Sequence, residues 1–386
     1  MRHRSAVLLG FMAVTTTLPV IGARGQENDP VRIYVGTYTE GDDQGINLLE
    51  MDPESGAIEL KGVVAATENP SFLAIHPGKP LLYAVNEVEQ FEGESSGAVG
   101  AFRIDPESGE LTLINQVSSK GGAPCHIVVD PSGENVLIAN YSGGNVAVLP
   151  IEDDGSLGEA NAVQHEGSGP NPRRQAGPHA HSINLDASGR FAVAADLGID
   201  KYLVYRFDPE SHTLAPNDPP ATSVEPGAGP RHFDFHPDNR LAFGINELNS
   251  TVSVFRFDPE AGTLMETQAV TTLPLDSDVS NSTADVHVHP TRPYLYGSNR
   301  GHNSIAIFQI DEEAATVTPI GHQLTGGSTP RNFVIDPTGR FLLAANQATG
   351  SIVVFRINQE SGLLEQTEFQ VEVPSPVCLK FAPNGP

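Results

Sequence analysis

The sequence predicts an all-β protein, a β-propeller of seven four-stranded blades. One observation is a strand-like segment that recurs at a period of about 50 residues, which lies in the range of propeller blades. A second is the abundance of short runs rich in Val, Ile and Phe between turn residues, in a chain with 38 Gly and 31 Pro. The third is that incomplete copies of the repeat stand at the two ends and together make one more blade.

The repeat is carried by six segments that alternate apolar and polar residues and then end in a turn, often Asp-Pro or His-Pro. A second strand ending in Asn or Asp follows each of them, then a third strand, a turn such as Asp-Pro-Glu-Ser-Gly, and a fourth strand. Four strands per unit correspond to one propeller blade. The six first strands lie at 70–77, 124–131, 180–187, 230–237, 283–290 and 330–337.

The two ends of the chain supply the seventh blade. Residues 376–383 repeat the first strand where the chain stops, and residues 33–37 repeat the second strand with nothing before them. Segments 46–52 and 58–64 provide the third and fourth strands. We therefore expect the N-terminal strands to pair with a C-terminal strand, which closes the ring and leaves no open sheet edge. A single domain, residues 26–386, accounts for the whole mature chain.

Residues 1–25 differ from the repeats. Arg2 and Arg4 make a basic start, residues 5–22 are apolar and uncharged, and small residues precede Gln26. This composition is typical of a secretory signal peptide that is cleaved before Gln26. A retained membrane anchor is the alternative, but three threonines and a proline dilute the apolar run. We expect a protein exported to the periplasm or the extracellular space, with no membrane association after cleavage.

Charge and cysteine content narrow the range of functions. The formal net charge of −26 argues against nucleic acid as a partner, because phosphates need a basic surface. Cys125 and Cys378 are too few for a disulfide scaffold, and a single bridge between them is left open. The sequence contains no phosphate-binding loop, dinucleotide fingerprint, nucleophile elbow or zinc-protease motif. We expect no cofactor and no metal.

Hairpin geometry divides the ring into two rims. The first two strands of a blade are antiparallel, so the start of the first and the end of the second share one rim. The turn between them lies on the other rim, and we take the first strand as the innermost. The turn rim carries repetitive turn residues that have a structural explanation. The other rim, named the polar rim from here on, offers Thr37, Tyr38, Ser71, Asn86, Glu87, Cys125, His126, Asn140, Tyr141, His181, Asp196, Arg231, His232, Asn246, Glu247, Asp285, Asn299, Arg300, Arg331, Asn332, Asn346, Gln347 and Val377.

The polar rim is the candidate functional site. Its three arginines, several histidines and two glutamates suit an anionic or oxygen-rich small molecule, although Arg231 and Glu247 could equally form a structural ion pair. The loop at 167–181 feeds the same rim and is much longer than a hairpin turn, which is typical of functional loops. Its His179 and His181 stand two residues apart, but no acidic residue beside them completes a metal site. We therefore expect a catalytic or binding histidine.

Several longer motifs resemble one known family. They include Gly-Pro-Asn-Pro-x-Arg-Gln-x-x-Pro-His-Ala-His at 169–181, Gly-Pro-Arg-His-x-x-Phe-His-Pro at 229–237, and Thr-Pro-Arg-Asn-Phe at 329–333, with further matches at 245–248 and 296–305. These stretches are similar to the lactonase propeller family, which includes 6-phosphogluconolactonases of the cycloisomerase type and fungal carboxymuconate cyclases. The resemblance covers essentially the whole mature chain and implies a seven-bladed propeller that acts on lactones without a required metal.

The resemblance also implies a set of site residues. The cyclases of the family are thought to use a histidine, a glutamate and two arginines in the channel mouth. The best matches are His181 (or His179), Glu247, Arg231, and Arg300 or Arg331, of which we expect His181, Glu247, Arg231 and Arg300 to be catalytic. The residues expected to bind the substrate are His126, Gln175, His179, Arg331, Asn346 and Gln347.

The expected function is hydrolysis of a sugar-acid lactone by a monomer. A rim histidine or Glu247 would act as general base on water, while Arg231 with Arg300 or Arg331 would bind the anionic group and stabilise the oxyanion. The related phosphogluconolactonases are cytoplasmic, whereas this chain carries an export signal, so a phosphorylated substrate is in question. The alternatives are a carboxymuconate-type cyclase or lyase, and a non-enzymatic propeller that binds a carbohydrate or protein. Unpaired arginines in an open mouth would favour catalysis.

Overall fold

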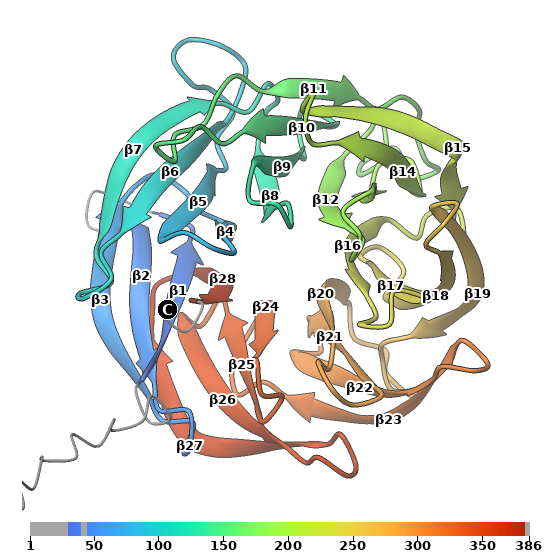
Figure 1. Cartoon of the computed structure of the whole chain (residues 1–386). Helices are drawn as coiled ribbons and strands as arrows, with labels where there is room; N and C mark the ends of the chain where they lie inside the picture. Colours follow the sequence, from blue (N-terminus) through green and yellow to red (C-terminus); the bar gives the residue numbers. More distant parts are fainter. Residues whose placement is uncertain (1–29, 40–44, 383–386) are drawn as a thin grey trace, which may run out of the picture.

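Seven antiparallel sheets surround a central axis and form a closed ring (Figure 1). The computed structural model describes residues 30–39 and 45–382, in which every regular element is a β-strand. The all-β, seven-bladed prediction is therefore confirmed. The predicted signal peptide, residues 1–25, lies outside the described residues. Within the described part of the chain, no helix is long and apolar enough to cross a membrane.

Each blade has four strands, and in the first six blades the strands follow chain order from the axis outwards. Blade 1 contains β4 (Leu73–Ile75), β5 (Leu81–Asn86), β6 (Ala98–Ile104) and β7 (Leu111–Ser118). Blade 2 contains β8 (Pro124–Val129), β9 (Asn135–Asn140), β10 (Asn145–Pro150) and β11 (Asn161–Gln164). Blade 3 contains β12 (Ala180–Leu185), β13 (Phe191–Asp196), β14 (Lys201–Asp208) and β15 (Thr213–Ser223).

The remaining blades repeat this order. Blade 4 contains β16 (Pro230–Phe235), β17 (Leu241–Asn246), β18 (Thr251–Asp258) and β19 (Thr263–Thr271). Blade 5 contains β20 (Ser282–Val288), β21 (Tyr294–Arg300), β22 (Ser304–Asp311) and β23 (Thr316–Leu324). Blade 6 contains β24 (Pro330–Ile335), β25 (Phe341–Asn346), β26 (Ser351–Ile357) and β27 (Leu364–Glu372). Blade 7 contains β28 (Pro376–Phe381), β1 (Val31–Thr37), β2 (Gly45–Met51) and β3 (Ile58–Ala66).

Blade 7 closes the ring as the sequence predicted. Its inner strand β28 comes from the C-terminal end and pairs with β1, with Val35 opposite Leu379 and Gly36 opposite Cys378. Gly36 has no substitute here, because a Cβ at this position would collide with the carbonyl oxygen of Pro70 in the neighbouring blade. The close approach of β1 to the segment before β4 of blade 1 therefore depends on this glycine.

Buried tyrosines join neighbouring blades. Tyr34, Tyr83 and Tyr296 occupy equivalent positions in second strands and are fully buried. Their hydroxyl groups donate to the carbonyl oxygens of Gly109, Gly155 and Gly362 at distances of 3.0, 3.2 and 2.9 Å. Each glycine lies in an outer turn of the next blade and has a positive φ, which L-residues with a Cβ rarely adopt. The tyrosine ring fills the gap between blades and its hydroxyl fixes their register.

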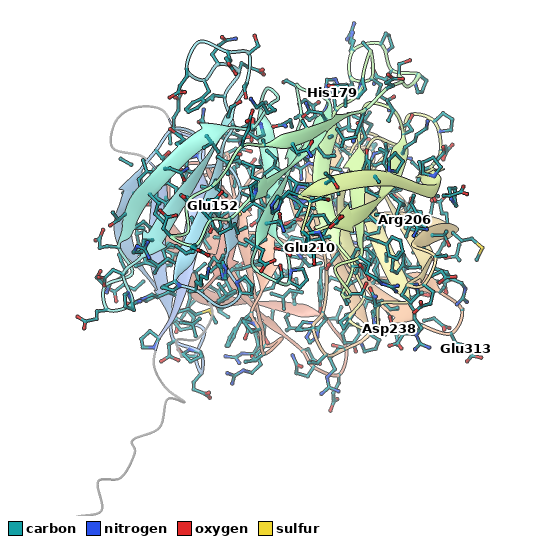
Figure 2. All side chains as sticks on the ribbon, turned by 45° about the horizontal axis from the view of Figure 1, so that its top comes forward. Glu152, His179, Arg206, Glu210, Asp238 and Glu313 are labelled. Carbon is teal, nitrogen blue, oxygen red and sulfur yellow. The ribbon has the colours of Figure 1, made fainter. Side chains whose placement is uncertain are left out.

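The turn rim is structural, as predicted. The imidazole Nδ1 of His76 accepts hydrogen bonds from the backbone of Gly78 and Lys79, and its Nε2 bonds to the carbonyl of Gly133 in the next blade, at 3.0 Å. His289 bonds in the same way to Gly339. Figure 2 shows Asp238 of this rim and His179 of the polar rim on opposite sides of the molecule. The candidate functional residues therefore lie on the polar rim.

Candidate functional site

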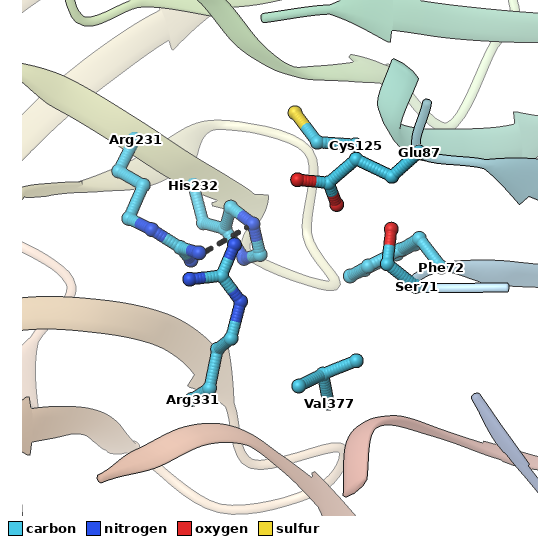
Figure 3. Close-up of a pocket in the computed structure, with 8 residues that line it drawn as sticks. All are labelled: Ser71, Phe72, Glu87, Cys125, Arg231, His232, Arg331 and Val377. Atoms are coloured by element: carbon cyan, nitrogen blue, oxygen red, sulfur yellow. Dashed lines mark hydrogen bonds between the residues drawn. The ribbon is translucent and has the colours of Figure 1, made fainter. Parts of the chain in front are cut away.

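A recess opens at the polar rim, near the axis of the ring. It is small, and its empty space amounts to about 210 Å³ only when the open solvent at its mouth is counted (Figure 3). Five inner strands or the residues just before them contribute to its wall, together with the residue that follows β5. The lining residues are Ser71, Phe72, Glu87, Cys125, Arg231, His232, Arg331 and Val377.

A repeated irregularity of the inner strands turns side chains into this mouth. In blades 2, 3, 4, 6 and 7, the register between the inner strand and its neighbour shifts at one residue close to the strand start. The extra residue is left out of the ladder, and such bulges commonly re-aim a side chain beside an active site. The residues skipped in this way are Cys125, His181, Arg231, Arg331 and Val377, and all of them except His181 line the recess.

Three arginines surround the carboxylate of Glu247. Arg231 Nε and Arg300 Nη2 lie 3.1 and 2.8 Å from Oε2, and Arg174 Nη2 lies 2.6 Å from Oε1. Burial raises the pKa of Glu247, but the charges of Arg300, Arg231 and Arg174 outweigh burial and lower it to about 2. Glu247 is therefore a permanent anion that holds the arginines in place, which argues for an orienting role rather than proton uptake.

Arg231 is the central group of this cluster. Its side chain is only 2% exposed and also donates through Nη1 to the carbonyl of Ala284 and to His232 Nε2, at 2.5 and 3.1 Å. Burial and then the charges of Arg300 and Arg331 lower the pKa of Arg231 to about 9, which leaves it protonated at neutral pH. The recess thus contains a fixed cation with no freedom to swing away.

Arg331 approaches the recess from blade 6 and has a different partner. Its Nη2 donates to the hydroxyl of Tyr38 at 2.8 Å, and its guanidinium lies 5.3 Å from the centre of the Tyr38 ring. Within the described residues, no carboxylate lies within ion-pair distance of Arg331. The Tyr38 hydroxyl in turn donates to Glu87, whose two carboxylate oxygens both lie 2.9 Å away.

Asp285 supports the arginine cluster from behind. It accepts hydrogen bonds from His232 Nδ1 at 2.6 Å, His287 Nε2 at 3.1 Å and Asn332 Nδ2 at 2.5 Å. These three partners come from blades 4, 5 and 6. Burial opposes ionisation of Asp285, but His287 and His232 outweigh it and hold its pKa well below the usual range. Asp285 therefore fixes the His232 ring, which contacts Arg231.

Three imidazole rings pack together beneath the recess. His232 lies 5.3 Å from His126 and 5.4 Å from His181, measured between ring centres, and Phe72 lies 4.4 Å from His126. Cys125 Sγ is 3.6 Å from His181 Nδ1. Burial raises the pKa of the Cys125 thiol, so this cysteine is not a thiolate nucleophile. Both cysteines are buried and unbridged, which settles the disulfide that the sequence left open.

The buried imidazoles predict a loss of stability in acid. Burial first, then nearby positive charge, lowers the pKa of His126 and His181 well below 6.5 and that of His232 to about 4. The unfolded chain then takes up more protons than the folded one between about pH 6.5 and 4, so the stability falls across this window as pH drops. His287 has the opposite sign: burial lowers its pKa, but Asp285 outweighs burial and raises it, so its contribution is lost as pH rises.

We expect the melting temperature of the mature protein to fall between pH 7 and 5. Thermal unfolding in buffers of equal ionic strength measures this, and replacing His181 by Asn should reduce the slope. A melting temperature that stays constant from pH 7 to 5 would contradict a neutral, buried histidine cluster.

The structure brings some predicted site residues together and separates others. Arg231 and Arg331 line the recess, Glu247 and Arg300 lie directly behind Arg231, and His126 and His181 lie in the imidazole cluster. Loop residue Arg174, which the sequence did not single out, joins this group through its contact with Glu247.

Five of the six residues predicted to bind substrate do not line the recess, namely His126 of the imidazole cluster and the four described next. Gln175 is fully buried and donates to the Leu197 carbonyl and to Asp200, so its side chain holds the loop at 167–181 together. Asn346 donates to the carbonyl of Thr325, in the connection between β23 and β24. His179 stacks on Tyr141 at 4.5 Å and bonds to its carbonyl oxygen. Gln347 is partly exposed at the end of β25.

Three residues that line the recess and two that support it were not selected from the sequence. Ser71, Tyr38, Glu87, His232 and Asp285 were all predicted on the polar rim, but nothing in the sequence separated them from the remaining rim residues. The one available signal was position, at the start of an inner strand or the end of its neighbour. In the described ranges 30–39 and 45–382, no group of three or more His, Cys, Asp or Glu side chains is arranged to hold a metal ion.

Comparison with known proteins agrees with this architecture. A family model described as "Lactonase, 7-bladed beta-propeller" matches residues 32–381. The 6-phosphogluconolactonase of Bacillus subtilis (strain 168) is 38% identical over 355 residues, which cover 90% of this chain and 97% of the relative. The periplasmic gluconolactonase of Pseudomonas aeruginosa is similar in structure, with a TM-score of 0.86, 34% identity, and coverage of 92% and 100%. A putative 6-phosphogluconolactonase from Bacteroides fragilis NCTC 9343 has a TM-score of 0.85 at 36% identity, covering 93% of this chain and 99% of that one. The chain therefore belongs to the lactonase family of seven-bladed β-propellers.

Proposed function

We propose that the protein hydrolyses a sugar-acid lactone in the recess of the polar rim. The observation that carries this proposal is the concentration of fixed cations there, because Arg174, Arg231, Arg300 and Arg331 gather around one mouth of a chain whose net charge is −26. A lactone carbonyl becomes an oxyanion when water attacks it, and prepositioned positive charge stabilises that state. Family membership and relatives that are named 6-phosphogluconolactonase or gluconolactonase support the same chemistry.

In the proposed reaction, Arg231 and Arg331 receive the carbonyl oxygen or an anionic group of the substrate. Glu247 and Arg300 keep Arg231 in position. The two bases predicted from the sequence are both engaged elsewhere. Glu247 is surrounded by arginines, and the His181 ring packs against Tyr141 and His232 at 5.4 Å each. We therefore assign the arginines to binding of the oxyanion and the substrate. The proton acceptor is then a residue other than Glu247 and His181.

The arginine pairing bears on the alternative functions. Arg231 and Arg300 are paired with Glu247, as a structural role would require, whereas Arg331 faces the recess with Tyr38 as its partner. Because Arg331 pairs with a phenol rather than a carboxylate and faces an open recess, this arrangement favours a catalytic site over a rim whose arginines serve only to stabilise the fold. A cyclase or lyase acting on an unsaturated dicarboxylate would use the same cations, and the assay below separates it from the hydrolase.

We further propose export by the signal peptide, a monomeric state, and activity without a metal.

The test is lactone ring opening by purified residues 26–386. Proton release in weak buffer is followed with glucono-δ-lactone and its 6-phosphate, each with and without EDTA. We expect a turnover of about 10 s⁻¹ or more on at least one lactone, a typical enzymatic rate, unaffected by EDTA. Rates equal to spontaneous hydrolysis for both lactones would overturn the proposal and favour the cyclase or binding alternatives. The preferred lactone decides whether the substrate is phosphorylated.

A further inference from the structure

The two carboxylates near the recess have opposite surroundings. Glu247 contacts three arginines and does not line the recess. Glu87 lines the recess, and no Lys, Arg or His in the described part of the chain lies within ion-pair distance of it. Its one side-chain hydrogen bond there comes from the hydroxyl of Tyr38. A carboxylate with one neutral donor keeps lone pairs free for a further hydrogen bond, such as one from water.

The Glu87 side chain is also held in one orientation. Its backbone N–H donates to the carbonyl of Asn69 at 3.0 Å, which ties the end of β5 to the segment before β4. Tyr38 centres its hydroxyl between the two carboxylate oxygens, and Arg331 fixes Tyr38 by hydrogen bond and ring contact. The carboxylate is thus positioned by residues of blades 1, 6 and 7. Such multiple support is expected of a group that must meet a substrate in a defined geometry.

Ser71 adds a second polar group on the same wall. Its hydroxyl oxygen is buried and has no hydrogen-bond partner among the described residues, yet it lines the recess. Figure 3 shows the Ser71 hydroxyl and the Glu87 carboxylate on one side of the recess, with the guanidinium groups of Arg231 and Arg331 on the other. One wall therefore presents a proton acceptor and a hydroxyl, and the opposite wall presents cations.

We propose that Glu87 is the general base of the reaction and that Ser71 helps to hold the attacking water. This inference rests on the proposed lactone hydrolysis. Glu87 takes a proton from water as the water oxygen forms a bond to the lactone carbonyl carbon, and the carbonyl electron pair moves to an oxygen that faces Arg231 and Arg331. When the intermediate collapses, the bond between the carbon and the ring oxygen breaks. The proton on Glu87 passes to that oxygen, which gives the hydroxy acid and restores the carboxylate.

The arrangement assigns distinct tasks to the neighbouring groups. Tyr38 is a positioning residue, since it touches Glu87 and Arg331 but does not line the recess. Tyr38 contacts both Arg331 and Glu87. Its phenol therefore links the arginine that binds the substrate to the carboxylate that acts as the base. A Tyr38→Phe variant is expected to lower kcat by about tenfold, since the base is present but less well oriented, and to raise KM as well, since Arg331 loses its hydrogen bond to the phenol.

The deciding variant is Glu87→Gln, with Glu89→Gln as its matched control. Glu89 follows two residues later, is exposed, and bonds to Ser142 outside the recess. We expect Glu87→Gln to lower kcat about a hundredfold or more, which is the usual contribution of a general base, and Glu89→Gln to stay within about twofold of wild type. Because the base must be ionised to accept a proton, kcat/KM of the wild type should decline in acid. This decline should be absent in Glu87→Gln.

A second variant covers the case in which the amide disturbs folding. Glu87→Ala leaves room for formate, and we expect added formate to restore part of the activity of Glu87→Ala but not of Arg231→Ala. Wild type is measured in the same assay. An active wild type with a Glu87→Gln turnover within threefold of it would overturn the assignment of Glu87 and leave the lactonase proposal standing. Failure of formate rescue in a folded Glu87→Ala protein would also overturn it. An inactive wild type would overturn both proposals.

Discussion

Replacing Arg231 by alanine is expected to lower kcat/KM for lactone hydrolysis about a thousandfold or more. Removing a single oxyanion donor costs about a hundred- to a thousandfold, and the loss of Arg231 removes one of the two arginines that line the recess. Its guanidinium is buried and held by Glu247, His232 and the carbonyl of Ala284, so alanine would also leave these three groups without their partner. Steady-state kinetics on the preferred lactone measure the effect.

Two further variants separate this effect from general damage. Arg231→Lys should recover little activity, because lysine cannot make the same set of directed hydrogen bonds to three partners. Arg292→Ala removes an exposed arginine on the turn rim and should leave kcat/KM within about twofold of wild type. An Arg231→Ala protein that melts cooperatively and retains more than a tenth of the wild-type kcat/KM would contradict a role for Arg231 in the transition state.

Replacing Asp285 by alanine is expected to lower the free energy of unfolding by about 3–5 kcal/mol, the usual result of removing one partner from a buried charged network. Asp285 is 2% exposed and accepts hydrogen bonds from His232, His287 and Asn332 on three different blades. The alanine variant would leave the buried donors of His232 and Asn332, and the partly exposed His287, without this acceptor and would free the His232 ring. Urea unfolding followed by intrinsic tyrosine fluorescence and circular dichroism measures the change.

The control for this prediction is Asp278→Ala. Asp278 is exposed in the loop that precedes β20, so its loss should change the unfolding free energy by less than about 0.5 kcal/mol. Since the Asp285 carboxylate is ionised in the folded protein, its contribution persists from neutral pH downwards until that carboxylate is protonated. A destabilisation below 1 kcal/mol would mean that the three donors find other partners and that Asp285 does not link the blades.

The ring itself was predictable because each blade repeats the same local sequence pattern of strands and turns. Alternating apolar residues identify the first strand, the Asp-Pro or His-Pro turn ends it, and the incomplete copies around residues 33–37 and 376–383 reveal how the ring closes. Antiparallel pairing then requires the polar rim and the turn rim to face opposite ways. The positions of Arg231, Arg331 and Glu247 at one mouth follow from this geometry alone.

The details of the site depend on features that a strand pattern does not encode. A bulge at one residue decides whether Arg231 or Pro230 faces the axis, and it appears only when the strands are paired. The number of arginines on Glu247 depends on Arg174, which arrives from a loop in another blade. Gln175, next to it in sequence, turns inward and stabilises that loop. Glu87 follows a strand end, where the side-chain direction is set by the contact of its backbone with Asn69.

Ring closure joins the two ends of the described chain beside the recess. The innermost strand of blade 7 is β28, and its partner β1 lies almost the full length of the domain away in sequence. Contacts between such distant segments form slowly compared with the local hairpins of the other blades. Val377 of β28 is part of the recess wall, so a chain that still lacks its C-terminal strand has no complete recess. The recess wall is therefore complete only when the C-terminal strand β28 has joined the ring.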